Sequence, residues 1–240
     1  MREVIVLTDP AAVADAAERL LYTELKFRVS ESGRFFVLLS GGSTPKEMYR
    51  LAAQRRGTEA DLYGRADYFL GDERMVAWDS PDSNGGEAAR LLLDPLGVAQ
   101  GRRHFPNGAS AAPEREADRI NAIMERTMPK NLGGAPVFDL AFLGVGADGH
   151  TASLFPGTAA LDLVEPKLVV NAVPQLQTTR FTATFPLLAA ARHVVFLVTG
   201  ATKAHLADRI RSGEPGSPGH PALRVRAERT TWLLDRAAAG

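Results

Sequence analysis

The sequence predicts an α/β fold with a mostly parallel, Rossmann-like sheet and helices on both of its faces. Apolar runs of strand length alternate with helical patterns along the chain, which favours strands joined by helical crossovers. Two runs, FFVLL at 35–39 and HVVFLV at 193–198, are almost wholly apolar, as strands buried on both faces are. We expect one domain spanning residues 1–240.

The N-terminal third of the chain predicts three strand and helix units in succession. Residues 3–8 form a first strand, and Pro10 begins a helix that ends before Gly33. The strand at 35–39 leads into a glycine-rich turn and a helix near Pro45. A third strand at 66–70 completes the pattern.

The remaining elements follow the same criteria. An amphipathic helix is expected at 115–128, with Ile120 and Met124 on its buried side. Residues 213–221 are rich in glycine and proline, which predicts a mobile loop. The other expected elements are helices at 87–93, at 186–191 and around Leu206 and Ile210, strands at 140–143, 167–173, 179–184 and 230–234, and one short strand between 102 and 113.

Composition excludes several classes of function. Lys plus Arg and Asp plus Glu balance at 28 each, so no overall field favours nucleic acid or an anionic membrane. The chain has no cysteine, which rules out a thiolate nucleophile and suits a reducing compartment. No apolar stretch approaches the ~18 residues of a membrane span, and the N-terminal run is too short for a signal peptide. We therefore expect a cytoplasmic protein, monomeric or else dimeric.

Polar signatures follow four of the apolar strands. These are SGGST at 40–44, GDER at 71–74, GVGADGH at 144–150 and TGATK at 199–203. Ligands of open α/β sheets bind beyond the carboxyl ends of the strands. The four signatures therefore predict one shared site at that edge.

The first signature has the features of a phosphate-binding loop. Ser40, Gly41, Gly42, Ser43 and Thr44 offer backbone N–H groups, hydroxyls and a helix N-terminus. The loop lacks the Gly-Lys-Ser/Thr ending of a nucleotide P-loop, which favours a phosphosugar over a nucleoside triphosphate. The alternative is a tight turn whose Ser or Thr only caps the helix.

Three cations are candidate phosphate ligands: Arg74, Arg180 and Lys203. Each could instead be an ordinary surface charge. Asp72 either holds Arg74 in place or reaches hydroxyl groups of the substrate, and the sequence leaves both possibilities open.

The third signature carries the candidate catalytic pair. His150 is expected to act as a general base and Asp148 to orient or charge it. We expect a helix to begin at His150, whose positive end would disfavour imidazolium. The N–H groups of Gly146 and Gly149 are candidate oxyanion donors. Alternatively, loop carbonyls satisfy His150 and it has no catalytic role.

Gly144, Gly146 and Gly149 match the Gly-x-Gly-x-x-Gly fingerprint of dinucleotide-binding sites, but the residues that follow them do not fit such a site. A long helix must follow the third glycine of such a site, and Pro156-Gly157 limits any helix here to roughly two turns. We expect no nicotinamide and no other cofactor. Without cysteine or an HExxH spacing, no metal site is expected, and Ser153 lies outside a Gly-x-Ser-x-Gly elbow.

Together the motifs resemble the 6-phosphogluconolactonase family, in the superfamily it shares with glucosamine-6-phosphate deaminases. The resemblance is carried by SGGSTP, GDER with Ser83-Asn84 after it, GADGHTASLFPG, RFTAT at 180–184 and GATK. Deaminases continue Asp-Gly-His with Ile-Ala-Phe-Asn-Glu-Pro, and have Asp-Glu-Tyr where this chain has Asp72-Glu73-Arg74.

The resemblance implies hydrolysis of the phosphosugar lactone 6-phospho-D-glucono-1,5-lactone. His150 would activate water with Asp148 beside it, and the 40–44 loop, Arg74, Arg180 and Lys203 would hold the phosphate. Two rival functions stay open: a deaminase or isomerase of an amino sugar phosphate, and a regulator that binds phosphosugars without catalysis.

Overall fold

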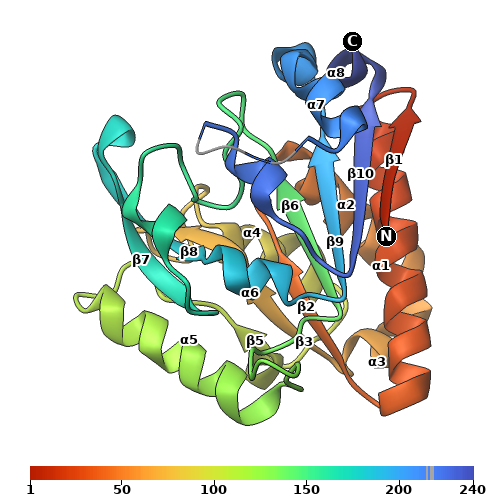
Figure 1. Ribbon diagram of the computed structural model, residues 1–240. Coiled ribbons are helices and arrows are strands. Elements are labelled where there is room, and N and C mark those ends of the chain that lie inside the picture. The colour runs from red at the N-terminus through yellow and green to blue at the C-terminus, as the bar shows by residue number, and fades with distance from the viewer. Residues whose placement is uncertain (215, 217–218) are drawn as a thin grey trace.

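The computed structural model describes residues 1–214, 216 and 219–240. Its main sheet has seven strands in the order β1-β10-β9-β6-β2-β3-β5, and every neighbouring pair is parallel (Figure 1). The strands are β1 (Arg2–Leu7), β2 (Phe35–Leu39), β3 (Ala66–Leu70), β5 (Arg103–His104), β6 (Leu140–Gly144), β9 (His193–Val198) and β10 (Arg229–Asp235). The predicted fold class is confirmed.

Helices cover both faces of this sheet, because the central strands present apolar side chains alternately to each face. In β2, Phe35 and Val37 face one apolar core, and Phe36 and Leu38 face the other. The first core is completed by α1 (Pro10–Ser32), α2 (Ser43–Arg56), α3 (Ala60–Tyr63) and η2 (Ala89–Leu93); the second by α5 (Pro113–Thr127), α6 (Phe185–Ala189), α7 (Ala207–Ser212) and α8 (Arg236–Ala239).

A second, antiparallel sheet of three strands lies beside the main one in the order β4-β8-β7. Its strands are β4 (Asp72–Arg74), β7 (Leu168–Val173) and β8 (Thr178–Ala183). The sequence predicted β7 and β8 but not their partner. The chain leaves β3 at Gly71 and turns directly into β4, so the GDER signature is itself a strand of this sheet.

Two helices differ from their prediction near the site. The helix expected at 87–93 begins earlier, as α4 (Asn84–Ala88), because Ser83 Oγ accepts the N–H of Gly86 at 2.9 Å and caps it. It then widens into the π-helical turn η2. The helix predicted around Leu206 starts as the 3₁₀ segment η6 (Ala201–Leu206).

Pro215, Ser217 and Pro218, within the loop expected to be mobile, lie outside the described residues. In the part of the chain that is described, no helix combines the length and apolar character needed to cross a membrane.

Candidate active site

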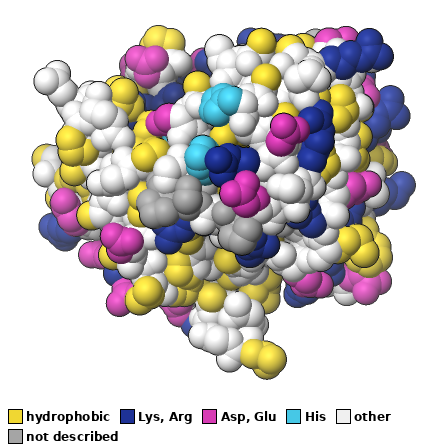
Figure 2. All heavy atoms as spheres, turned by 45° about the horizontal axis from the view of Figure 1, so that its top comes forward, with side chains coloured by type: hydrophobic (Ala, Val, Ile, Leu, Met, Phe, Trp, Pro, Cys, Tyr) yellow, Lys and Arg dark blue, Asp and Glu magenta, His cyan; other side chains and the backbone are white. Residues whose placement is uncertain are grey.

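The four strand-end signatures meet at one cavity of about 230 Å³, beyond the carboxyl ends of β2, β3, β6 and β9. Histidine, basic and acidic side chains gather on this face of the molecule (Figure 2). The predicted residues that line the cavity are Ser40, Gly41, Gly42, Ser43, Thr44, Asp72, Arg74, Gly146, His150 and Lys203.

The 40–44 loop turns sharply from β2 into α2. Gly42 precedes the helix with φ of 110°, a conformation that favours glycine, and no side chain caps the first turn. The first N–H groups of the helix therefore lack an intrahelical acceptor and face the cavity region. Ser40 contributes differently: its N–H is bonded to the Tyr49 hydroxyl at 3.2 Å, whereas its own Oγ is buried without a partner among the described residues.

Arg74 and Arg180 lie directly opposite each other in the β4–β8 ladder. Like charges in such a pair repel, and burial together with Arg74 lowers the pKa of Arg180. The Arg74 guanidinium is held by the carbonyl of Asp82 at 2.6 Å, and neither arginine has an ion pair within the described part of the chain. Two neighbouring cations that form no ion pair in this part of the chain suit an anionic ligand.

Lys203 adds a third cation on the opposite wall. Its Nζ donates to the carbonyl of Thr199 at 2.9 Å, and burial lowers its pKa while Asp235 opposes that shift. The hydroxyls of Thr199 and Thr44 are 3.0 Å apart, which joins the β9 and β2 loops across the cavity. A bound anion would offset the cost of burying this ammonium group.

His150 and Asp148 form the predicted pair. The His150 Nδ1 lies 2.5 Å from Asp148 Oδ1, and its ring stacks on Phe155 with the centroids 4.0 Å apart. Gly146 lies beneath the ring: a Cβ built there would be 2.1 Å from Nδ1. These contacts fix the ring, and with Nδ1–H donating to Asp148 the lone pair of Nε2 is free to accept a proton.

The expectation that a helix begins at His150 is wrong. Residues 145–158 contain no helix and are closed by a short bridge between Thr151 and Leu154. No macrodipole therefore acts on the imidazole, and Asp148 is its charged neighbour. The missing helix also leaves the Gly-x-Gly-x-x-Gly pattern without the element that a dinucleotide site requires.

The two glycines predicted as oxyanion donors are not available. The N–H of Gly146 donates to the His150 carbonyl at 2.9 Å, and that of Gly149 to the Gly146 carbonyl at 3.0 Å. Both donors are consumed in closing the loop, so neither can hold an oxyanion in this conformation. Gly149 does not line the cavity.

Asp72 is held by neighbours that sequence reasoning did not assign to the site. It accepts from Ser153 Oγ at 2.8 Å and from Asn84 Nδ2 at 3.2 Å, and makes no ion pair with Arg74. Asp72 therefore lines the cavity with its carboxylate oriented by Ser153 and Asn84. The sequence signal for Asn84 was its place in the Ser83-Asn84 pair after GDER. In the structure, a Cβ at Gly41 would lie 1.8 Å from Asn84 Oδ1, so the glycine makes room for this side chain.

Glu73 is fully buried and joins β4 to α4. Its carboxylate accepts from the N–H groups of Arg74, Asn84 and Gly85 at 2.7 to 2.8 Å and from Ser83 Oγ at 2.9 Å. Burial raises its pKa, against these hydrogen bonds. Glu73 thus positions Asn84 and the backbone of Arg74, and not the Arg74 guanidinium.

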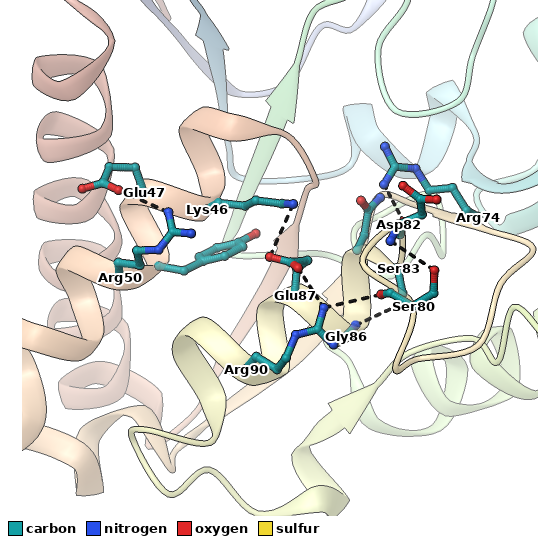
Figure 3. A network of polar contacts seen from close by, with 12 residues as sticks. Lys46, Glu47, Arg50, Arg74, Ser80, Asp82, Ser83, Gly86, Glu87 and Arg90 are labelled. Carbon is teal, nitrogen blue, oxygen red and sulfur yellow. Dashed lines mark hydrogen bonds and ion pairs between the residues drawn. The ribbon is translucent and has the colours of Figure 1, made fainter.

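The loop that holds Arg74 is itself tied to α2 and α4 (Figure 3). Arg90 donates to the carbonyls of Trp78 and Ser80 at 3.2 and 3.4 Å and pairs with Glu87 at 2.8 Å. Glu87 also pairs with Lys46 at 3.4 Å. The network fixes the segment whose Asp82 carbonyl receives Arg74.

Asp148 and Arg180 line an adjoining depression of about 470 Å³ that shares Asp72, Arg74 and His150 with the cavity. His150 therefore lies at the junction of the two spaces, with Asp148 on the side of the depression. Within the described residues, no three His, Asp or Glu side chains are grouped as metal ligands. His104 and His193 instead bond to Asp67 at 2.8 Å and Thr231 at 2.9 Å.

Comparisons with known proteins find relatives over nearly the full length of the chain. The profile of the family described as glucosamine-6-phosphate isomerases/6-phosphogluconolactonase matches residues 8–232. A 6-phosphogluconolactonase of Synechocystis sp. is 36% identical, over 98% of this chain and 96% of its own. The crystal structure of the 6-phosphogluconolactonase from Thermotoga maritima has a TM-score of 0.82 and 26% identity, over 98% of this chain and 100% of its own. The three-dimensional structure of the 6-phosphogluconolactonase from Trypanosoma brucei has a TM-score of 0.83 and 25% identity, over 100% of this chain and 98% of its own.

Proposed function

The chain belongs to the family of glucosamine-6-phosphate isomerases and 6-phosphogluconolactonases, and we propose that His150 and Asp148 are its catalytic pair. It is an enzyme, a lactone hydrolase that opens 6-phospho-D-glucono-1,5-lactone to 6-phospho-D-gluconate. The observation that carries the assignment of the pair is the 2.5 Å contact between His150 Nδ1 and Asp148 at the edge of a cavity lined by cations.

The phosphate of the substrate is held by the 40–44 loop with Arg74, Arg180 and Lys203. Among the described residues, none of the three cations forms an ion pair with a carboxylate, and the first turn of α2 supplies N–H donors. Asp72, oriented by Ser153 and Asn84, accepts from sugar hydroxyls. Fixing the lactone in this way makes attack by water effectively intramolecular.

The reaction then requires one proton to move twice. Nε2 of His150 takes a proton from water while the oxygen attacks the lactone carbonyl carbon, giving a tetrahedral oxyanion. Collapse of the oxyanion breaks the bond between that carbon and the ring oxygen, which receives the proton from the imidazolium. Asp148 stabilises the imidazolium in between, since its carboxylate accepts from Nδ1. The product acid loses a proton to solvent.

We further propose a single functional domain over 1–240, working as a cytoplasmic monomer without a cofactor. Support for the single domain comes from the site itself, whose residues extend from Ser40 to Lys203. Light scattering of the purified protein measures its molar mass in solution and so tests the proposed monomeric state.

Proton release on adding fresh lactone tests the function, because the product is an acid. Wild type should exceed both His150→Gln and a blank without enzyme, which corrects for spontaneous hydrolysis. General base catalysis contributes about 10²–10⁴-fold, so His150→Gln should lose that much kcat. Near wild-type turnover in this variant would contradict the assignment of His150 as the general base. Release of ammonia from glucosamine 6-phosphate by the wild type would favour the deaminase function.

A further inference from the structure

A buried carboxylate lies behind the wall of the active-site cavity that carries Lys203. Asp235 is the last residue of β10, which lies beside β9 in the main sheet (Figure 1). It is 2% exposed and does not line the cavity. Leu234 is in register with Val198, so Asp235 ends β10 at the level where the TGATK signature follows β9. The four strand-end signatures do not include it.

Asp235 fixes the turn between β9 and Lys203. Both of its carboxylate oxygens accept from the N–H of Gly200, at 3.1 Å. Gly200 has φ of 94°, a conformation that favours glycine, and its carbonyl accepts the N–H of Lys203 at 3.1 Å. Asp235 also accepts from the N–H of Ala238 at 2.7 Å, as the N-cap of α8. The carboxylate thus joins α8 to the turn that begins η6.

The charge of Asp235 acts on Lys203 without a direct contact. In the part of the chain that the structure describes, neither side chain forms an ion pair. Asp235 raises the pKa of Lys203, against the burial that lowers it, and so favours the ammonium form. The ammonium group uses one of its three protons on the carbonyl of Thr199. A direct ion pair would compete with an anionic ligand for the other two, and this arrangement avoids that competition.

We propose that Asp235 is a positioning residue for the substrate phosphate, acting through Gly200 and Lys203 without touching the substrate. The inference rests on the proposed function, in which Lys203 binds that phosphate. The same turn follows Thr199, whose hydroxyl lies 3.0 Å from that of Thr44 in the 40–44 loop. A shift of the turn would therefore disturb both walls of the phosphate subsite, whereas the catalytic pair lies in a different loop.

Asp235→Asn and Asp235→Ser separate this role from that of a helix cap. Asn and Ser are both favoured N-cap residues, so α8 keeps its cap in either variant. Both variants remove the charge behind Lys203. We expect KM for the lactone to rise at least ~10-fold, as when one hydrogen bond to a charged group is lost, with kcat within about 2-fold of wild type. Calorimetry with the product, 6-phosphogluconate, should show the same loss of affinity.

A double-mutant cycle shows whether Asp235 acts through Lys203. In the Lys203→Ala background the ammonium group is gone, so Asp235→Asn should change the affinity for 6-phosphogluconate less than about 2-fold. Asp139→Asn is the matched control, because Asp139 is also a buried carboxylate that accepts a backbone N–H, that of Phe36 at 2.9 Å. Asp139 precedes β6 at the opposite, amino edge of the sheet. Its variant should leave KM and product affinity unchanged, whatever its effect on Tm.

An unchanged KM in both Asp235 variants, with or without a fall in Tm, would overturn the inference, because Asp235 would then serve the fold alone. Equal losses of affinity in the wild-type and Lys203→Ala backgrounds would also overturn it, since Asp235 would then act independently of Lys203. If the wild type neither hydrolysed the lactone nor bound 6-phosphogluconate, the proposed function itself would be refuted, and this inference with it.

Discussion

The ring of His150 occupies the space that a side chain at residue 146 would need. This contact, together with Phe155 on one ring face and Asp148 at Nδ1, sets the direction of the imidazole. The glycine at 146 is therefore required by the neighbouring His150 side chain and not by an unusual backbone angle. The same holds for Gly41, whose missing Cβ makes room for Asn84.

Gly146→Ala should lower kcat by about 10²-fold, because a displacement of about 1 Å of a catalytic group has that effect. The new methyl group would lie 2.1 Å from His150 Nδ1 and push the ring away. Steady-state kinetics with the lactone measures the loss. Gly144→Ala is the matched control, since a Cβ there meets nothing within 4 Å. Equal effects of the two changes would contradict the steric explanation.

Arg180→Gln should raise KM at least ~10-fold, the value of one hydrogen bond to a charged group. It should not lower the Tm of the unliganded protein, because the repulsion between Arg74 and Arg180 disappears. Arg180→Lys keeps the charge and should lose less affinity. A fall in Tm with unchanged KM would show that Arg180 serves the fold and not the substrate.

At the scale of elements, the active site depends on the junction of β4 and α4. Glu73 lies in a three-residue strand and caps the start of a five-residue helix, neither of which is stable alone. Through this one carboxylate, Arg74 on the strand and Asn84 on the helix reach the same cavity. The small sheet thereby supplies the site with its pair of arginines.

Glu73→Gln should lower the free energy of unfolding by about 1–3 kcal/mol, since an amide nitrogen cannot accept the bonds that Oε2 receives. Urea denaturation at neutral pH measures the change. Glu87→Gln, in the helix α4 that Glu73 contacts, removes only ion pairs near the surface and should cost less than about 1 kcal/mol. If both variants lost the same amount, Glu73 would have no special part in joining the two elements.

Over the whole molecule, Glu24 joins α1 to the amino edge of the main sheet. It contacts His193 on β9 at 3.3 Å and Arg229 on β10 at 3.1 Å. The hydrogen bond from His193, aided by the charge of Arg229, lowers the pKa of Glu24. The contact lies at the opposite edge of the sheet from the active site, so it concerns the stability of the fold.

This lowered pKa predicts how stability depends on pH. The ionised carboxylate favours the folded state at pH values above the ordinary Glu pKa of about 4.3. The contribution disappears as pH falls through the lowered pKa of the folded state. Glu24→Gln should therefore be less stable than wild type at neutral pH, with the difference shrinking in acid.

Urea denaturation of both proteins across the acid range measures that difference. Glu31→Gln, an exposed position of the same helix, should show no such pH dependence. A difference between wild type and Glu24→Gln that stayed constant below the ordinary Glu pKa would exclude linkage to this carboxylate.

The local sequence predicted most of the elements and the cavity residues, because apolar runs and glycine-rich turns act within a few residues. FFVLL and HVVFLV form buried strands, and the signatures after β2, β3, β6 and β9 converge as predicted. It did not predict Asn84 and Ser153 as partners of Asp72, since Ser153 is 81 residues away along the chain. The sequence pattern also predicted a helix that begins at His150, and the structure has no helix there.

The sequence by itself determined the fold class, the edge of the sheet where the site lies, and the residue types gathered there. Strand periodicity and glycine turns encode these locally, and parallel strands bring their carboxyl ends together. The tertiary structure alone decided which donors are already used, as with Gly146 and Gly149, and which cations form no ion pair within the described part of the chain, as with Arg74, Arg180 and Lys203. Hydrogen bonding and ion pairing depend on distances of a few ångströms between distant segments, which no local pattern specifies.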